Sequence, residues 1–371
     1  MLDDNTWVDS LLELVTLKVD ALTQKNDGYI PYMATDGQYS DKQNDIVWWT
    51  NGFWGGMLWQ LWQSTGKTSY KDHAEILEKQ LDAAFDRYQG LHHDVGFMWL
   101  HTAVANYRLT GNERSLQRGL HAAHLLAGRY NPEGKFIRSW NRDRAGWIIV
   151  DSMLNIPLLY WASEVLDDPR FTYIAKNHAD TVMEKIIRPD GSSAHIAVLD
   201  PTTGELLETP GGQGYASGSS WSRGQAWALY GFALSYKHTA EKKYLDTAKR
   251  VAHYFIANVA ATDYVPLCDF RSPAEPVILD TSAGLCAACG LLEIAEHVPE
   301  FEREFYYSNA VKIIKSISTK HLLSQLDNEG IIDMAAAEYH AKETQDLPII
   351  YGDYFFLEAI LRVKKKGFLI W

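Results

Sequence analysis

The chain repeats one pattern five times: an apolar helix, a short polar break and then a more charged helix. Hydrophobic residues recur at helical spacing along most of the sequence, and the alternation typical of strands is scarce. Successive breaks are between 45 and 72 residues apart (Thr65 to Thr110 and Asp167 to Thr239). This irregular spacing argues against a solenoid with a repeat of constant length. The breaks fall at residues 64–67, 109–112, 166–169, 238–241 and 297–300.

Five hairpins account for ten of the twelve helices that the periodicity predicts, and the first and last helices remain unpaired. If the chain closes on itself, these two helices form a sixth pair. Six apolar helices then form an inner ring and six amphipathic helices an outer ring. We therefore predict an all-α fold, an (α/α)6 barrel, in a single domain of residues 1–371. The alternative is an open helical array, which would leave apolar helices uncovered. The twelve helices are expected to begin near Trp7, Gly52, Ser69, Val95, Asn112, Ser152, Pro169, Ser222, Lys243, Ser282, Phe301 and Asp353.

The charge balance restricts the partners of the chain. Its 371 residues contain 35 Lys and Arg against 47 Asp and Glu, which gives a formal net charge of −12. An acidic chain attracts neither nucleic acid nor an anionic membrane surface, so we expect neither partner. No apolar stretch approaches the ~20 residues of a membrane-spanning helix. The N-terminus shows no basic segment followed by an apolar one, which favours a cytoplasmic protein.

The three cysteines are too few for a disulfide framework. Cys286 and Cys289 have the spacing of a zinc-binding pair, but they lie in a stretch rich in Ala and Leu that predicts a helix, and Cys268 stands alone. A structural zinc site needs about four ligands with recognisable spacing. We expect these cysteines to be buried as small hydrophobic residues, and we expect neither a metal nor a cofactor.

Aromatic residues make up 12% of the chain and include 13 Trp. Either the core is unusually bulky, or aromatic faces line a site. Many unusual polar and aromatic residues fall in the long connections or at the starts of apolar helices. In a closed barrel these segments all face one mouth. Trp221 and Trp227 offer flat faces of the kind that pack against sugar rings, although each is equally compatible with a place in the core.

Two aspartates stand at the starts of expected inner helices. Asp151 follows three apolar residues, and an apolar environment favours the protonated form of a carboxyl, which suits a general acid. Asp94 follows His92 and His93 in a similar position. Either aspartate is equally well explained as a helix N-cap. Two carboxylates at neighbouring helix starts would form an acid/base pair.

Other polar residues lie in the same connections. His195 is in a loop, where it either contacts a ligand or is solvated. A Gly-rich segment leads to Arg223 in the first turn of a helix, and it does not match a phosphate-binding loop. The guanidinium of Arg223 would suit a carboxylate at that helix N-terminus. The basic segment 138–144 has Trp140 within it and Trp147 just after it, and it could line the mouth.

Five segments follow one another in order: Trp49–Trp54, His92–Phe97, Ile148–Asp151 with Asn155–Leu159, Trp221–Trp227 and Tyr351–Ala359. Together they resemble the unsaturated glucuronyl hydrolases, glycoside hydrolase family 88, over nearly the whole chain. The family fold is an (α/α)6 barrel. The resemblance implies a substrate left by a polysaccharide lyase, an oligosaccharide ending in a 4,5-unsaturated uronic acid. It also implies that hydration of the C4=C5 vinyl ether starts the reaction.

The resemblance assigns roles to individual residues. Asp151 would protonate C4 and help to activate the water that adds at C5, and Asp94 would hold or polarise the site. The sequence departs from the family pattern where Gly212 stands in place of a His and Asn51 in place of an acid. The residues expected to contact the sugar or water are His93, His195, Gln213 and Arg223, and those expected to form a stacking wall are Trp49, Trp140, Trp221 and Trp227.

Three other functions fit the same residues. The first is an unsaturated rhamnogalacturonyl hydrolase, which shares the barrel and the hydration chemistry. The second is a conventional inverting glycosidase, and the third is a carbohydrate-binding protein without turnover. The sequence leaves the linkage that is cut, the preference for sulfated sugars and the choice between monomer and homodimer open.

Overall fold

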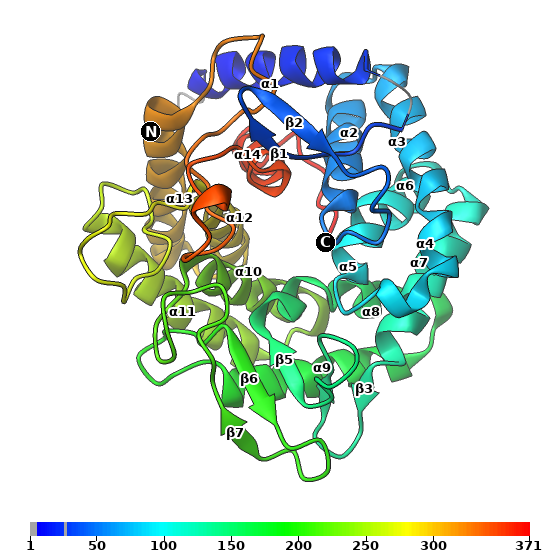
Figure 1. Ribbon diagram of the computed structural model, residues 1–371, viewed down its shortest axis with the longest axis vertical. Coiled ribbons are helices and arrows are strands. Elements are labelled where there is room, and N and C mark those ends of the chain that lie inside the picture. Colours follow the sequence, from blue (N-terminus) through cyan, green and yellow to red (C-terminus); the bar gives the residue numbers. More distant parts are fainter. Residues whose placement is uncertain (1–5, 26–27) are drawn as a thin grey trace.

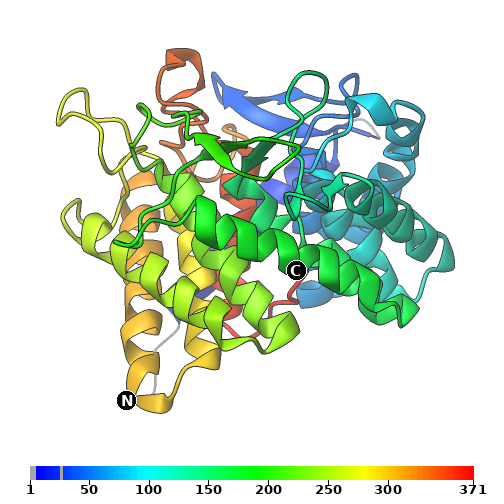
Figure 2. The same ribbon diagram turned by 90° about the horizontal axis from the view of Figure 1, so that it is seen from below.

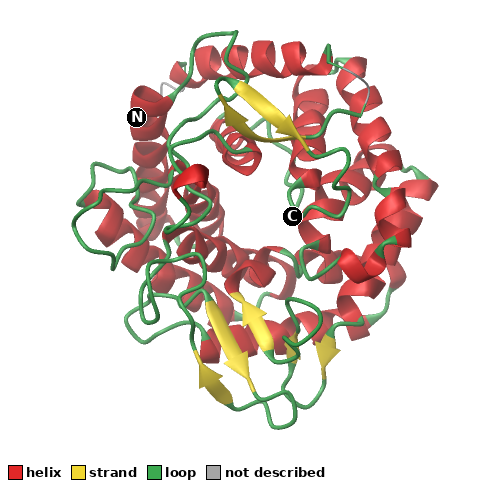
Figure 3. Ribbon diagram, in the orientation of Figure 1, coloured by secondary structure: helices red, strands yellow, loops and turns green. Residues whose placement is uncertain are grey.

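A computed structural model describes residues 6–25 and 28–371. The N-terminal residues 1–5, to which the expectation about a leader segment refers, lie outside the described residues. Long helices alternate between an inner and an outer ring around a common centre (Figures 1 and 3). The inner ring contains α2 (Asn51–Thr65), α5 (Val95–Trp99) continued by a π-helical turn η2 (Leu100–Val104) and α6 (Ala105–Thr110), α8 (Pro157–Leu166), α10 (Ser222–Thr239), α12 (Thr281–His297) and α14 (Ile350–Val363). The outer ring contains α1 (Trp7–Thr23), α3 (Thr68–Gln80), α7 (Glu113–Ala127), α9 (Pro169–Lys185), α11 (Lys242–Ala260) and α13 (Glu300–His321).

The inner ring is closed. Each inner helix contacts the next one along the chain, and the last, α14, packs against the first, α2. Each outer helix packs on its own inner partner, and α1 packs on α14 as the sixth pair. The predicted (α/α)6 barrel is therefore confirmed, including the pairing of the first and last helices.

The two ends of the barrel differ in their connections. At one end, five turns of two residues each join an inner helix to its outer partner, at 66–67, 111–112, 167–168, 240–241 and 298–299. Gly66 and Gly111 end their helices in the left-handed conformation, with φ of 73° at each, which is the usual role of glycine at a helix C-terminus. The long connections gather at the other end, on the upper side of Figure 2.

The long connections carry the small elements that an all-α prediction omits. Three antiparallel sheets occur in the described residues, and the one formed by β5, β6 and β7 leads directly into the residues around Asp151. The strands are β1 (Pro31–Thr35), β2 (Gln38–Asp41), β3 (Tyr130–Asn131), β4 (Phe136–Ile137), β5 (Trp147–Ile149), β6 (Ile196–Leu199) and β7 (Leu206–Glu208). The short helices are α4 (Asp82–Asp86) and the 3-10 turns η1 (Tyr88–Gly90), η3 (Val150–Leu154) and η4 (Lys342–Thr344).

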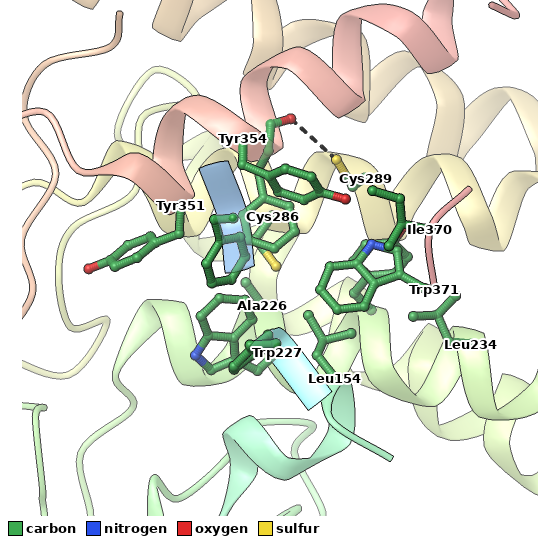
Figure 4. Close-up of a cluster of buried hydrophobic side chains, with 14 of the residues drawn as sticks. Leu154, Ala226, Trp227, Leu234, Cys286, Cys289, Tyr351, Tyr354, Ile370 and Trp371 are labelled. Carbon is green, nitrogen blue, oxygen red and sulfur yellow. Dashed lines mark hydrogen bonds between the residues drawn. The ribbon is translucent and has the colours of Figure 1, made fainter. Parts of the chain in front are cut away.

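The inner helices are buried on every side because neighbours surround them. In α12, every residue from Thr281 to Ala295 is buried. Figure 4 shows the layer where this helix meets α10 and α14, with Cys286 and Cys289 among aromatic rings. All three cysteines are buried and unpaired, as expected for small hydrophobic residues. Within the described residues, no helix combines the length and the apolar character needed to cross a membrane.

Candidate active site

The starts of the inner helices meet at the end of the barrel that carries the long connections. Asp94 directly precedes α5, Asp151 lies in η3 before α8, and Arg223 is the second residue of α10. Asp280 precedes α12, and Tyr351 is the second residue of α14. A helix N-terminus carries a partial positive charge of about half a unit. The converging helix starts therefore favour an anionic ligand, although the net charge of the chain is −12.

Asp94 lies between two histidines. Its Oδ2 is 3.2 Å from His92 Nδ1, and its Oδ1 is 3.0 Å from His93 Nε2. Burial disfavours the charged forms, but attraction within the pair lowers the pKa of Asp94 and raises the pKa of His93. His93 Nδ1 lies 3.0 Å from the Ser139 carbonyl oxygen, which can only accept, so this nitrogen carries a proton. The geometry holds Asp94 as a carboxylate beside a protonated imidazole.

Asn155 connects the two aspartates. Its Nδ2 donates to Asp94 Oδ1 at 2.8 Å and to the Asp151 carbonyl at 3.2 Å. Its Oδ1 accepts from the Phe97 N–H at 2.8 Å. Gly96 makes this approach possible, because a Cβ there would lie 2.5 Å from the Asn155 backbone. The starts of α5 and α8 are thus held together by one amide.

Asp151 faces His195. Asp151 Oδ1 is buried and lies 3.4 Å from His195 Nε2. His195 Nδ1 accepts a hydrogen bond from the Gln213 N–H at 3.0 Å, so the proton of the neutral ring is on Nε2. The preceding residue, Gly212, has φ of 58°, and a Cβ there would lie 2.0 Å from His195 Nδ1. A larger residue here would displace the His195 ring, so glycine is required for this position of His195.

The guanidinium of Arg223 is not a free fork. Its Nη1 donates to Asp280 Oδ2 at 2.6 Å and to the Ala336 carbonyl at 2.5 Å, and its Nη2 donates to the Ala337 carbonyl at 2.6 Å. The side chain is buried, with its guanidinium carbon 4.4 Å from the centre of the Trp221 ring. The sequence led us to expect a fork open to a carboxylate ligand. The structure instead pairs Arg223 within the protein and leaves only Nε without a partner among the described residues.

Two of the four expected wall tryptophans are partly exposed. Trp49 is half-buried and stacks on Tyr351, with ring centres 5.3 Å apart. Trp140 is also half-buried, and its ring centre is 6.5 Å from that of His93. Both rings keep surface at the mouth of the barrel. They can therefore contact a ligand directly.

The other two tryptophans are covered. Trp221 is 2% exposed and packs against His195, with ring centres 4.4 Å apart. Trp227 is fully buried between Phe97 and Phe355. In Figure 4 its indole nitrogen points away from Trp371. These two rings support the site from behind, which is the core position that the sequence left open, whereas the family resemblance implied a stacking wall.

Several buried polar atoms around the two carboxylates have no hydrogen-bond partner among the described residues. Buried polar atoms are nearly always paired in native proteins, so these atoms are available to hydrogen-bond water or a polar ligand. Aromatic and ionic contacts connect five of these residues to one another or to Trp49, whereas Trp227 contacts Phe97 and Phe355. The atoms include Asp151 Oδ1, His195 Nε2, Arg223 Nε, Tyr351 Oη, Trp221 Nε1 and Trp227 Nε1.

Residues 22–262 match the family described as Glycosyl Hydrolase Family 88. The chain is also 35% identical to the unsaturated glucuronyl hydrolase of Bacillus sp. (strain GL1), over 97% of each chain. The chain belongs to glycosyl hydrolase family 88.

Other relatives of this family 88 enzyme agree. It is 32% identical to the unsaturated chondroitin disaccharide hydrolase of Streptococcus pneumoniae, over 98% of this chain and 92% of that protein. The crystal structure of the Bacillus sp. GL1 enzyme, described as responsible for the degradation of glycosaminoglycan, superposes with a TM-score of 0.89 at 33% identity, covering 95% of each chain. The unsaturated glucuronyl hydrolase of Streptococcus agalactiae gives 0.93 at 29% identity, covering 100% of this chain and 95% of that one.

The family 88 chain also offers three possible metal ligands in one place. Ligand atoms of His92, His93 and Asp94 lie within 4.8 Å of one another. Both histidines, however, already direct a ring nitrogen at an Asp94 oxygen. The arrangement is that of a proton-sharing cluster around a carboxylate.

The ten residues that the sequence predicts as a site remain candidates in this family 88 enzyme, and three further residues contact them. Asn155 is four residues after Asp151, and that spacing could have indicated a shared helix face. Tyr351 begins an inner helix as Arg223 does. Asp280, the partner of Arg223, carried no signal of its role.

Proposed function

We propose that residues 1–371 form one catalytic domain that releases a 4,5-unsaturated uronic acid from the non-reducing end of lyase-generated oligosaccharides. The observation that carries this proposal is the pair of unlike carboxylates, Asp94 and Asp151, connected through Asn155. Asp94 is held ionised by two histidines, whereas the buried Asp151 Oδ1 faces a single histidine, His195, at 3.4 Å. Carboxyl groups in different environments suit different roles in one reaction.

The relatives support the substrate class. Their names refer to unsaturated glucuronyl and unsaturated chondroitin disaccharide substrates, which favours the glucuronyl over the rhamnogalacturonyl alternative. One related structure contains the oligosaccharide dGlcA-Glc-Rha-Glc, and another from Streptococcus agalactiae contains dGlcA-GalNAc6S. Both ligands begin with the unsaturated sugar that we propose here.

The proposed reaction begins with proton transfer from the Asp151 carboxyl to C4. The π electrons form the new C4–H bond, and the positive charge that develops at C5 is shared with the ring oxygen. The resulting Asp151 carboxylate then takes a proton from the water that adds at C5, which regenerates the acid. The C5 hemiketal opens, and the hemiacetal left at C1 releases the leaving sugar as an alcohol. The anionic charge of Asp94 stabilises the positive charge at C5.

The remaining residues position the sugar. His195, with its proton on Nε2, orients Asp151, and Trp49 and Trp140 contact the sugar faces. The helix starts provide a positive field for the uronate carboxylate. Arg223 adds to this positive field although its Nη atoms are paired within the protein. Its Nε is the one guanidinium nitrogen left to contact the uronate directly. We also propose a cytoplasmic location, since three unpaired buried cysteines fit a reducing compartment, and a monomer or homodimer.

The test is a panel of unsaturated disaccharides, chondroitin-type and rhamnogalacturonan-type, followed by the loss of ultraviolet absorbance of the double bond. We expect consumption of the chondroitin-type substrate, and Asp151→Asn should bind it with nearly unchanged affinity but lose nearly all turnover. Consumption of the rhamnose-linked substrate alone would overturn the proposed specificity. An active Asp151→Asn enzyme would overturn the role of Asp151.

A further inference from the structure

The loop between β4 and β5 carries three arginines beside the proposed sugar site. Arg138, Arg142 and Arg144 stand against a single acid, Asp143, in this stretch. Arg144 is exposed, and its guanidinium carbon lies 4.9 Å from the centre of the Trp140 ring and 4.8 Å from that of Trp147. Two aromatic contacts thus hold a long cationic side chain in one place.

The charges of these arginines are not neutralised by the protein. Among the described residues, no carboxylate lies within ion-pair distance of Arg138, Arg142 or Arg144, whereas Arg118 and Arg362 each pair with two acids or more. Arg138 donates to the Trp140 carbonyl at 2.5 Å and so holds the loop backbone. In an acidic chain, this loop is a local positive surface.

The position of Arg144 relative to the reacting groups defines what it can reach. Trp140 contacts His93 with ring centres 6.5 Å apart, and His93 lies against Asp94. Trp140 thus connects the exposed Arg144 to the cluster around Asp94. With the unsaturated, non-reducing sugar at the buried carboxylates, the reducing-side sugars would extend toward exposed groups such as Arg144.

We propose that Arg144 binds an anionic group, a sulfate or a carboxylate, on the reducing-side portion of the substrate. This inference rests on the proposed function and extends it to the leaving group. An arginine already held by two aromatic rings loses little conformational freedom on binding, and its planar fork matches an oxyanion. Arg144 is thereby a specificity-determining residue, distinct from the residues that carry the reaction.

The experiment compares the wild type with Arg144→Gln on three kinds of unsaturated chondroitin-type substrate. These are the unsulfated disaccharide, disaccharides sulfated on the hexosamine, and an unsulfated tetrasaccharide that carries a second uronate. We expect Arg144→Gln to lower kcat/KM about tenfold for a charged leaving group, the size of one charge-assisted hydrogen bond. For the unsulfated disaccharide, kcat/KM should change by less than about twofold. An effect on sulfated disaccharides assigns a sulfate, and one on the tetrasaccharide assigns a carboxylate.

Arg170→Gln is the matched control, because Arg170 also lies over an aromatic ring, Phe171 at 4.6 Å, but at the start of α9 at the opposite end of the barrel. It removes the same charge and should leave all three substrates unaffected. Arg144→Lys keeps the charge and should retain much of the preference even if Arg144→Gln folds poorly. The inference is overturned if Arg144→Gln lowers kcat/KM equally for all three substrates or for none of them. It is also overturned if the wild type is inactive on both the sulfated disaccharides and the tetrasaccharide. A wild type inactive on the unsulfated disaccharide as well overturns the proposed function itself.

Discussion

His195 accepts a hydrogen bond on Nδ1 from the Gln213 backbone and directs Nε2 at Asp151 Oδ1, 3.4 Å away. A backbone N–H thus selects the tautomer of the imidazole that faces the proposed acid. Gln213 in turn donates through Nε2 to the Ala337 carbonyl at 2.8 Å. The loop that fixes His195 is therefore attached to the 322–349 connection on the other side of the mouth.

Gly212→Ala should disrupt this arrangement. Its Cβ would lie 2.0 Å from His195 Nδ1, at a φ of 58° that favours glycine. We expect kcat to fall by about 10–100-fold, since a displacement near 1 Å has an effect of that size. Gly218→Ala is the control, with φ of 80° and no atom within 4 Å of its Cβ, so it introduces backbone strain alone. Equal kcat values for the two variants would contradict the role given to the Gly212–His195 contact.

Asn155→Ala should reduce both stability and activity. It leaves Asp94 Oδ1 and the Phe97 N–H without their partner, and the buried unpaired groups cost about 1–3 kcal/mol of unfolding free energy. We expect kcat to fall at least tenfold, as the two helix starts lose their connection. Asn106→Ala provides the comparison, because this equally buried amide, in α6, donates to Glu78 of α3 away from the mouth. It should lower stability and leave kcat unchanged, and a normal kcat in Asn155→Ala would refute the positioning role.

His93 should give the protein a pH-dependent stability. Its pKa is raised in the folded state, because attraction to Asp94 and hydrogen bonds outweigh burial. The stabilisation is complete below the unfolded pKa of about 6.5 and is lost as the pH rises through the higher folded value. The difference in unfolding free energy between wild type and His93→Gln should therefore be larger at pH 6 than at pH 9. His73→Gln, on the outer helix α3, should show no such trend, and a flat difference for His93→Gln would disprove the ion pair with Asp94.

Asp353 should also lower stability as the pH rises, but over a more acidic range. Burial raises its pKa from 3.8 to about 7, despite hydrogen bonds from Tyr39, Ile332 and Ile331. The folded state binds the proton more tightly than the unfolded state. This carboxyl therefore lowers the free energy of unfolding by roughly 4 kcal/mol as the pH rises from about 4 to 7, and by no more above pH 7.

Asp353→Asn cannot titrate and should remove this slope in urea unfolding measured from pH 4.5 to 7.5. Asp36→Asn is the control. Asp36 is exposed in the turn of the β1–β2 hairpin, whose Tyr39 bonds Asp353, and its substitution should keep the wild-type slope. If Asp353→Asn retained the full slope, another group would be responsible.

The barrel could be predicted from the sequence because its signal is local. The breaks within the hairpins are marked by residues such as Gly66 and Gly111, and helices without a polar face must be surrounded by others. The site could be placed because the inner helices all start at one end. Asp94, Asp151 and Arg223 then meet by topology alone.

What the sequence did not show depends on contacts between distant segments. The partner of Arg223, Asp280, is 57 residues away along the chain, and its carbonyl acceptors lie more than 110 residues away. Trp227 and Trp49 are the same residue type near helix starts, yet one is enclosed and the other reaches the mouth. Helical periodicity predicts the side of the helix on which a residue lies. It does not predict whether aromatic rings from neighbouring helices cover that residue.

The hydration of C4=C5 is the central claim, and isotope placement tests it most directly. A single turnover in H2-18O, quenched rapidly to limit exchange of the carbonyl groups with solvent, is analysed by mass spectrometric fragmentation of the released uronic acid. The account predicts the label on C5, because water adds there and the ring oxygen remains on C1. A label on C1 would show direct attack at the anomeric carbon and contradict the account.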